Sequence, residues 1–271
     1  MRLSIDHRTR YRFSQPQARI VQLLRLTPSD TDDQTITSWR IDVDCDARLR
    51  EGRDGFGNRI TMLYCNGPIE EIEIAVAGEV LTGEIDGLVK GTLESLPPAL
   101  FARDTEITRP DDAIIAFAAA AGGSNDRARL EELNTAFARR FELVDDRPEH
   151  GRSVAEAFTL QTATARDMAQ MFVSAARTLA VPARYVSGHC LTCEAGTDRP
   201  TTHGWAEAYV DGTGWIGFDP SFGRLIDETY VRVAQGLDSA QAAPIAGSRL
   251  GPGREWLDVD VQVERVEGED Q

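Results

Sequence analysis

The sequence predicts an α+β protein with a β-rich N-terminal part followed by a core of helices packed on an antiparallel sheet. Three observations predict this. Apolar and polar residues alternate through the first 85 residues, helical spacing takes over until Pro182, and alternation then returns. We expect a β-rich domain over residues 1–90 and a core domain over residues 91–271.

The N-terminal alternation has period two, which indicates strands with one buried and one solvated face. Residues that follow this period are Leu3, Ile5, His7, Trp39, Ile41, Val43, Ile72, Ile74 and Val76. The segment 54–58, Asp-Gly-Phe-Gly-Asn, predicts a turn between two such strands.

Four helices are expected after Pro110. The first covers the Ala-rich stretch 113–121, after two aspartates and before two glycines. Residues Leu130, Leu133, Phe137 and Phe141 mark one face of the second, and a short third helix is expected over 153–158. The fourth carries Met168, Met171, Phe172, Ala175 and Leu179 at helical spacing. Thr164 is its expected N-cap, with Asp167 as capping-box partner, and Pro182 ends it.

The remaining chain predicts strands separated by one long loop. The expected strands are 183–189, 203–210, 214–218, 229–233 and 257–263. The Ala-, Gly- and Pro-rich stretch 240–253 is expected to be a loop, and there is no internal repeat.

The composition excludes several classes of function. A net charge of −15 over 271 residues repels phosphate backbones, which argues against nucleic-acid binding. No run approaches the roughly 18 apolar residues of a membrane span, and the charged N-terminus lacks the apolar region of a signal peptide. Four cysteines do not make a disulfide scaffold. We expect a cytoplasmic protein with reduced thiols and no membrane partner.

Two short segments carry candidate chemistry. His203 lies in Thr-His-Gly-Trp-Ala-Glu (202–207) and Asp219 in Gly-Trp-Ile-Gly-Phe-Asp-Pro (214–220), on strands joined by a short turn. Antiparallel neighbours bring side chains of one face into contact. An imidazole held by a carboxylate is the base-and-orienter pair of nucleophilic catalysis. Such a pair, taken alone, is more often structural than catalytic.

A nucleophile would have to face this histidine. The N-terminus of a buried helix suits it, because backbone N–H groups and the helix dipole favour a thiolate and an oxyanion. Ala165 lies in the first turn of the fourth predicted helix, on its apolar face, and we expect it to be largely buried.

The order of these segments resembles the bacterial transglutaminase-like family. The resemblance rests on Pro-Ala-Arg-Tyr-Val-Ser-Gly (182–188), the two segments around His203 and Asp219, and the stretches 11–16, 24–28, 230–234 and 243–247. It covers nearly the whole chain. It implies a transglutaminase- and papain-like fold and a Cys-His-Asp triad, with His203 as base and then acid and Asp219 as its orienter.

The family pattern places the cysteine in Gly-x-Cys-x-Asp at the start of the helix. This chain reads Ala163-Thr164-Ala165-Arg166-Asp167, so alanine occupies both the cysteine and the glycine positions. The methyl group of Ala165 cannot attack a carbonyl. The alanine is either natural or a cysteine-to-alanine substitution made to trap a complex; Ala163 is a second departure that such a trap does not explain.

Three hypotheses follow. In the first, the protein is inactive but still binds peptide or glutamine-bearing amide substrates. In the second, the native protein has cysteine at 165 and is an amide hydrolase or acyltransferase that works through a thioester. In the third, it is a structural partner of an active relative. The substrate, the choice between hydrolysis and transfer, and the oligomeric state are left open, and no cofactor is predicted.

Other residues with reactive or ligating side chains are weaker candidates. Thr162 and Thr164 carry hydroxyls near the helix end, but Thr164 is better explained as the N-cap. Cys190 and Cys193 have CxxC spacing without a second ligand pair, which disfavours zinc, so no metal site is predicted. Cys45 and Cys65 are expected to be packing residues. For substrate binding we name Trp205 and Trp215, which flank the pair as either core or groove residues.

Overall fold

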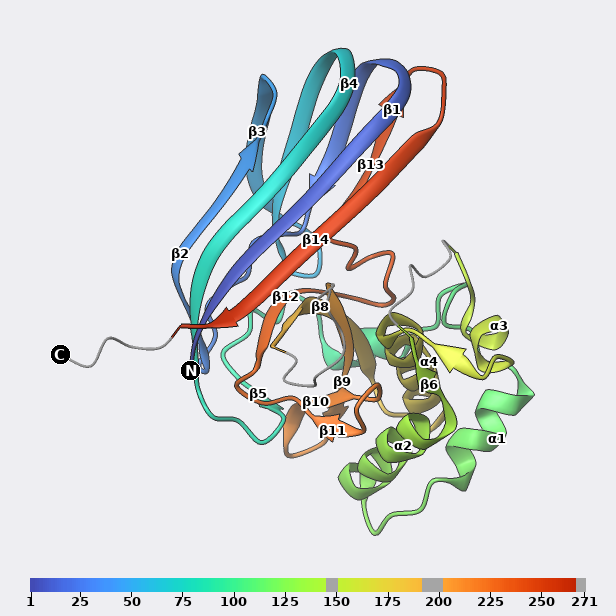
Figure 1. Cartoon of the computed structure of the whole chain (residues 1–271). Coiled ribbons are helices and arrows are strands. Elements are labelled where there is room, and N and C mark those ends of the chain that lie inside the picture. Colours follow the sequence, from blue (N-terminus) through green and yellow to red (C-terminus); the bar gives the residue numbers. More distant parts are fainter. Residues whose placement is uncertain (145–150, 192–201, 267–271) are drawn as a thin grey trace, which may run out of the picture.

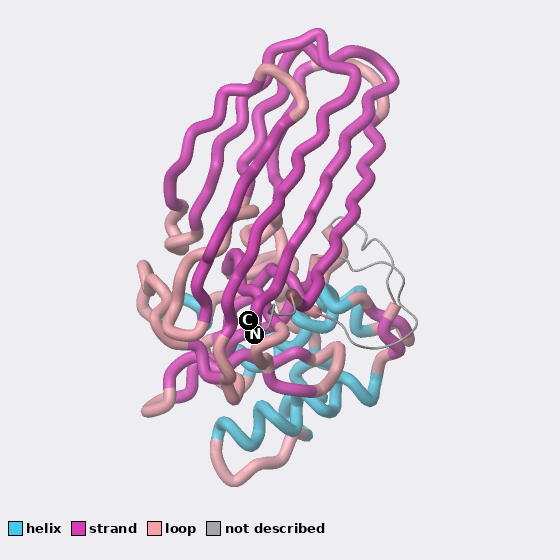
Figure 2. Tube along the Cα trace, turned by 60° about the vertical axis from the view of Figure 1, so that its left-hand side comes forward, coloured by secondary structure: helices cyan, strands magenta, loops and turns pink. Residues whose placement is uncertain are grey.

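In the computed structural model, the chain forms two lobes: an upper lobe of long strands and a lower lobe of helices around a second sheet (Figure 1). The structure describes residues 1–144, 151–191 and 202–266. Figure 2 shows that the long strands make two layers above the helices.

The upper lobe is built from one six-stranded antiparallel sheet that folds over on itself. Its two long strands, β1 (Arg2–Leu24) and β4 (Arg59–Thr82), rise in one layer, bend near the top and return in the other (Figure 1). The bend coincides with shifts in the β1–β4 register between Arg12 and Arg19. The first layer is completed by β2 (Gln34–Val43) and β14 (Glu255–Arg265), and the second by β3 (Ala47–Arg53) and β13 (Ile245–Leu250).

Apolar side chains from both layers form the core of this sandwich. The alternation predicted from the sequence is what turns them inward, since successive strand residues face opposite sides. The buried members are Tyr11, Phe13, Ile20, Leu24, Leu26, Leu63, Cys65, Ile69, Ile72, Ile74 and Val76. Each large side chain buried in this way contributes about 1.5–3 kcal/mol relative to an exposed one.

The end of the chain departs from the expected organisation. Residues 245–250 form strand β13 inside the stretch 240–253 that we expected to be a loop. This short strand lacks a clean apolar alternation, and its pairing with β1 makes it a strand. Both β13 and β14 fall within the expected core domain 91–271 but pair with β1. Residues 88–89, which fall in the expected first domain 1–90, form the short strand β5 (Leu88–Val89), and this strand pairs with the sheet of the lower lobe.

The lower lobe contains a second antiparallel sheet with strand order β11-β10-β9-β8-β12. Its strands are β8 (Ala183–Cys190), β9 (His203–Val210), β10 (Gly214–Asp219), β11 (Arg224–Leu225) and β12 (Tyr230–Gly236). Strand β9 has the same bounds as the strand predicted over 203–210. The ends of β8, β10 and β12 lie within three residues of the predicted ends.

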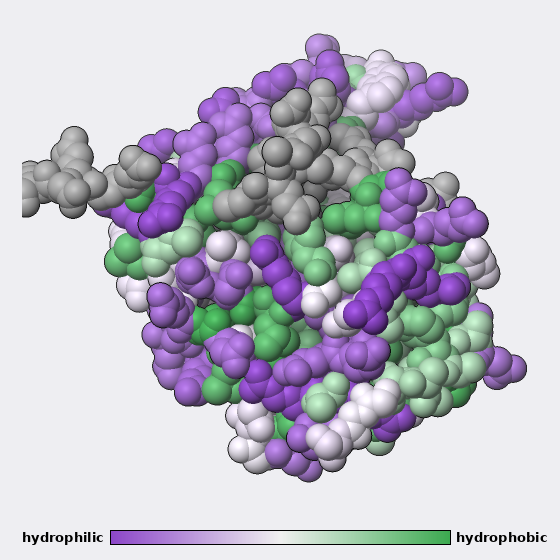
Figure 3. Space-filling view, turned by 60° about the horizontal axis from the view of Figure 1, so that its bottom comes forward, coloured by the Kyte–Doolittle hydropathy of each residue, from purple (hydrophilic) through white to green (hydrophobic). Residues whose placement is uncertain are grey.

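The four expected helices are present. They are α1 (Asp112–Ala120), α2 (Asp126–Arg140), α3 (Val154–Phe158) and α4 (Ala165–Thr178), preceded by the 3₁₀ helix η1 (Pro98–Ala102). A two-stranded parallel ladder, β6 (Glu142–Leu143) with β7 (Thr162–Ala163), lies just before α4. Hydrophilic and hydrophobic residues are interspersed on the lower face of the molecule (Figure 3).

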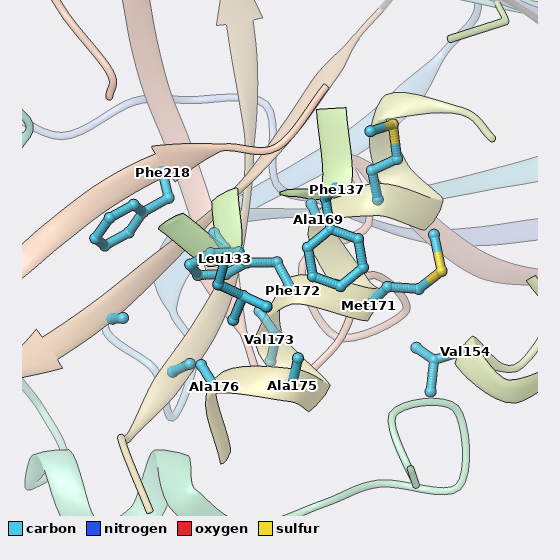
Figure 4. Packing of buried hydrophobic residues seen from close by; sticks show 14 of the residues in the cluster. Leu133, Phe137, Val154, Ala169, Met171, Phe172, Val173, Ala175, Ala176 and Phe218 are labelled. Atoms are coloured by element: carbon cyan, nitrogen blue, oxygen red, sulfur yellow. The ribbon is translucent and has the colours of Figure 1, made fainter. Parts of the chain in front are cut away.

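Helix α4 lies at the centre of the lower lobe. Thr164 caps it, accepting a hydrogen bond from the Asp167 backbone N–H, while the Asp167 carboxylate reaches back to the cap. The helix packs against β8 and β9. Its Phe172 ring lies 5.1 Å from that of Phe218 and 6.3 Å from that of Phe137, between centroids (Figure 4). Within the described residues, no helix is both long and apolar enough to cross a membrane.

The two lobes meet through polar contacts as well as apolar ones. Gln34 of β2 accepts from the backbone N–H of Arg232 and donates to its carbonyl, at 2.8 and 3.0 Å. Asn58, in the predicted turn 54–58, does the same with Gln235. Because these side-chain amides match backbone groups of β12, the junction has a fixed register.

Two buried histidines also meet at the junction. His7 of β1 and His189 of β8 lie with ring centroids 5.6 Å apart. Burial lowers the pKa of His7 to about 4, although the charge of Asp6 acts in the opposite direction. Burial, reinforced by His7, lowers the pKa of His189 to about 3. Both rings are therefore neutral in the folded protein at neutral pH.

We predict that this pair makes the protein acid-sensitive. The unfolded chain takes up protons near pH 6.5 while the folded chain does not, so stability is complete above pH 6.5 and is lost as the pH falls towards 4. At pH 5 the loss should be about 2 kcal/mol per histidine. Denaturant unfolding at pH 7 and pH 5 measures it. A His7→Gln, His189→Gln double variant should show a much flatter pH dependence; an unchanged slope would contradict the assignment.

Candidate active site

His203 and Asp219 form a short, buried hydrogen bond. The Nε2 atom of His203, the first residue of β9, lies 2.6 Å from Oδ2 of Asp219, the last residue of β10. The Asp219 side chain is fully buried and that of His203 is 10% exposed. The expected contact is thus present, and it leaves Nδ1 as the ring nitrogen available to a reacting group.

Two further hydroxyls hold the carboxylate of Asp219. Tyr230 donates its hydroxyl to Oδ2 at 2.7 Å, and Ser221 donates both its backbone N–H and its hydroxyl to Oδ1. Burial would raise the pKa of Asp219, but the charge of His203 and the hydrogen bonds from His203, Ser221 and Tyr230 outweigh it, so the pKa lies below the ordinary value. The carboxylate is therefore ionised and fixed in orientation.

Aromatic rings enclose the imidazole. The ring of Phe222 is nearly parallel to that of His203, with centroids 5.8 Å apart, and the rings of Tyr230 and Trp205 lie at 6.0 and 6.4 Å. Arg224 in turn donates to the Tyr230 hydroxyl at 3.1 Å. The histidine thus has one anionic partner and otherwise apolar neighbours among these contacts.

Ala165 is the first residue of α4, as expected for the nucleophile position. It is half-buried, not largely buried, because the first turn reaches the surface while Met168 and Phe172 lie in the interior. Its neighbour Ala163 is only 2% exposed, so the methyl group that replaces the family's glycine hydrogen lies in packed surroundings. The hydroxyl of Thr164 is engaged with Asp167, which matches the expected capping role.

The two tryptophans named for substrate binding lie in the interior. Trp205 is 0% exposed and Trp215 is 4% exposed. Trp215 lies under the guanidinium of Arg184, 3.8 Å from ring centroid to Cζ. Trp205 packs with Val186 and Tyr230, and it borders a small pocket at the junction of the lobes. These positions support the core interpretation, and substrate contact remains a hypothesis.

A buried ion network occupies the middle of the same sheet. Glu207 of β9 accepts from Arg184 of β8 at 2.6 Å and from Arg232 of β12 at 2.8 Å. Burial would raise the pKa of Glu207, but the two arginines lower it to about 2. Arg184 is fully buried and also donates to Glu94. Glu207 lies in the segment 202–207, whose residue pattern alone gives no sign of this network.

The CxxC segment is described only in part. Cys190 ends β8 and is buried; burial, with a smaller effect from the charge of Asp219, raises its pKa to about 12. Cys193 lies outside the described residues. Within 1–144, 151–191 and 202–266, no group of three or more His, Cys, Asp or Glu residues is placed to hold a metal ion.

Comparison with known proteins agrees with this geometry. Residues 3–81 match the bacterial transglutaminase-like N-terminal region, and residues 115–220 match the transglutaminase-like superfamily. The chain therefore carries both a bacterial transglutaminase-like N-terminal region and a transglutaminase-like core. Relatives of this transglutaminase-like protein include an uncharacterized protein of Mycobacterium leprae, 25% identical over 98% of this chain and 99% of the relative. An uncharacterized protein of Mycobacterium tuberculosis H37Rv is 26% identical over 99% of this chain and 94% of the relative.

A solved structure shares the fold of this transglutaminase-like protein. It is the crystal structure of a "Putative Cysteine Protease" from Cytophaga hutchinsonii, with a TM-score of 0.75 and 19% identity. The match covers 100% of this chain and 92% of that one. Both lobes are therefore included in the shared fold.

Sequence reasoning missed the residues of this transglutaminase-like protein that hold the carboxylate. Ser221 follows Asp219 by two positions, which is the spacing of a local Asx turn and could have been noticed. Tyr230 gave no such signal, because its contact depends on how β12 lies relative to β10.

We predict that Tyr230→Phe weakens the hold on Asp219 without disturbing the fold. Loss of one hydrogen bond to a buried carboxylate should lower the free energy of unfolding by about 1–3 kcal/mol and raise the pKa of Asp219. Denaturant unfolding and an NMR titration of the Asp219 carboxyl carbon measure the two effects. Tyr64→Phe, at a tyrosine that is 38% exposed, is the matched control and should change neither.

Proposed function

We propose that this transglutaminase-like protein binds peptide or glutamine-type amide substrates at the His203–Asp219 site and does not catalyse acyl transfer. One observation carries the proposal. The hydrogen-bonded pair of His203 and Asp219 is ordered, but the nucleophile position holds Ala165. The hydrogen bonds from Ser221 and Tyr230 support it, because they hold Asp219 as they would in a working centre.

The chemistry of the site explains the division between binding and reaction. In an active relative, a thiolate at position 165 would attack the amide carbonyl, His203 would protonate the leaving amine, and the thioester would pass to water or to another amine. Without sulfur there is no thioester. The imidazole and the helix N-terminus at Thr164–Ala165 still offer hydrogen-bonding groups to an amide.

A second candidate is an active amide hydrolase or acyltransferase with cysteine at 165. It is favoured by the intact His203–Asp219 pair, since a chain without catalytic selection has no need to keep it. The codon of the native gene at position 165 separates the two candidates. A buried alanine at 163, which a single engineered substitution would not introduce, favours the inactive protein.

We predict that the site binds a glutamine-bearing peptide weakly and specifically. Isothermal titration with a short glutamine peptide should give saturable binding, which His203→Ala weakens by about tenfold, the equivalent of one lost hydrogen bond. The same peptide with methionine in place of glutamine, and the variant Arg48→Ala on strand β3, are the controls. Equal affinity of all peptides and variants, or no binding at all, would contradict the proposal. It would favour the hypothesis that the protein is a structural partner of an active relative.

We predict that Ala165→Cys restores a reactive thiol. The helix N-terminus and His203 should bring its pKa below the free value of about 8.5. Iodoacetamide should label it faster than Cys190, which is buried, and His203→Ala in the same background should slow the labelling. Amide hydrolysis should require Ala163→Gly as well. If the introduced thiol labels no faster than a peptide thiol, with or without His203, position 165 is not a vacated catalytic centre.

A further inference from the structure

Two of the cysteines lie against each other in the upper lobe. Cys65 lies in β4 with its side chain in the sandwich core, and Cys45 lies in the bend between β2 and β3. Their sulfur atoms are 3.1 Å apart, and both are free thiols in the structure. Non-bonded carbon atoms pack at roughly 3.5–4.0 Å, and sulfur is larger than carbon. The two thiols are therefore closer than ordinary packing requires.

The backbone holds the two residues in this position. Ala47 is directly opposite Cys65 on the β3–β4 ladder. Its backbone N–H donates to the carbonyl of Cys45 at 2.8 Å, which turns the bend back over the ladder. A disulfide at about 2.05 Å needs the sulfurs to approach by only about 1 Å more, a movement that side-chain rotation supplies.

We propose that Cys45 and Cys65 are a disulfide site that a small disulfide compound oxidises. The thiolate of Cys45, the more exposed of the two, attacks one sulfur of the oxidant and releases its first half as a thiol. The thiolate of Cys65 then attacks the sulfur of Cys45 and releases the second half. Two protein thiols become one disulfide, and one oxidant molecule is reduced to two thiols.

The residues around Cys45 determine which oxidants it attracts and how fast the disulfide forms. Asp44 and Asp46 flank Cys45, so a cationic disulfide is attracted and an anionic one is repelled. Burial, followed by the effects of Cys65 and of these two carboxylates, raises the pKa of Cys45 to about 12. Little thiolate exists at neutral pH, so the bond forms slowly and exchanges slowly once formed. These are the properties of a structural bond and not of a catalytic redox pair.

The bond would tie the bend after β2 to the central strand β4. It closes a loop that contains all of β3, an edge strand with side chains that are mostly exposed. Closing a loop of this size should raise the melting temperature by about 5–10 °C.

Cystamine, a cationic disulfide, provides the test. Reduced full-length protein incubated with it at pH 8.5 should lose the thiols of Cys45 and Cys65, and peptide mapping without reductant should find a 45–65 bridge. In Cys65→Ser the reaction should stop at a cysteamine adduct on Cys45, because no second thiol resolves it. In Cys45→Ser, Cys65 should stay unmodified. Glutathione disulfide should react more slowly with the wild type than cystamine does.

Three results would overturn the proposal. One is a persistent cysteamine adduct on Cys45 of the wild-type protein. Another is a map in which Cys45 and Cys65 remain alkylatable after oxidation. The third concerns the melting temperature. The proposal fails if oxidation raises the melting temperature of the wild type no more than the same treatment raises that of Cys65→Ser.

Discussion

The buried carboxylate of Glu207, held between Arg184 and Arg232, is the constraint on which the arrangement of the lower sheet depends. Taking an ion from water into a protein interior costs several kcal/mol, and good geometry is needed to offset this. Here the partners come from three strands, β8, β9 and β12, and Arg184 and Glu207 are directly opposed in the β8–β9 ladder. A shift of one residue would turn Glu207 to the other face of the sheet and take its carboxylate away from both arginines.

That register also places His203. It lies four residues before Glu207 on the same strand, so the two side chains share a face, while Ala206 and Ala208 face α4. The hydrogen bond to Asp219 is then determined by the β9–β10 pairing of Phe218 with Ala206. The ion network around Glu207 and the His203–Asp219 pair thus lie on one rigid face of the sheet. This explains how the pair stays ordered although position 165 carries no reactive group.

Local signals in the sequence were enough for most elements. The caps at Asp111, Ser153 and Thr164 lie at helix starts that composition and spacing indicated. The bounds of β9 and the contact of His203 with Asp219 followed from alternation and a short turn. What failed was non-local: β13 is a strand only because β1 offers it a ladder, and Tyr230 reaches Asp219 only through the placement of β12. The interior positions of Trp205 and Trp215 required knowledge of both faces of the sheet.

The position of β1 has a consequence for how the molecule is made. This strand lies between β4 on one side and β13 and β14 on the other, so residues 2–24 pair with residues 245–265. During synthesis the outer edge of β1 has no partner until more than two hundred further residues have been added, including the whole lower lobe. Contacts of such long sequence separation form slowly, and an open strand edge invites pairing with other chains. The upper lobe is thus the first to be translated and the last to be complete, and a nascent chain stalled before residue 245 would carry an open sheet edge into the cell.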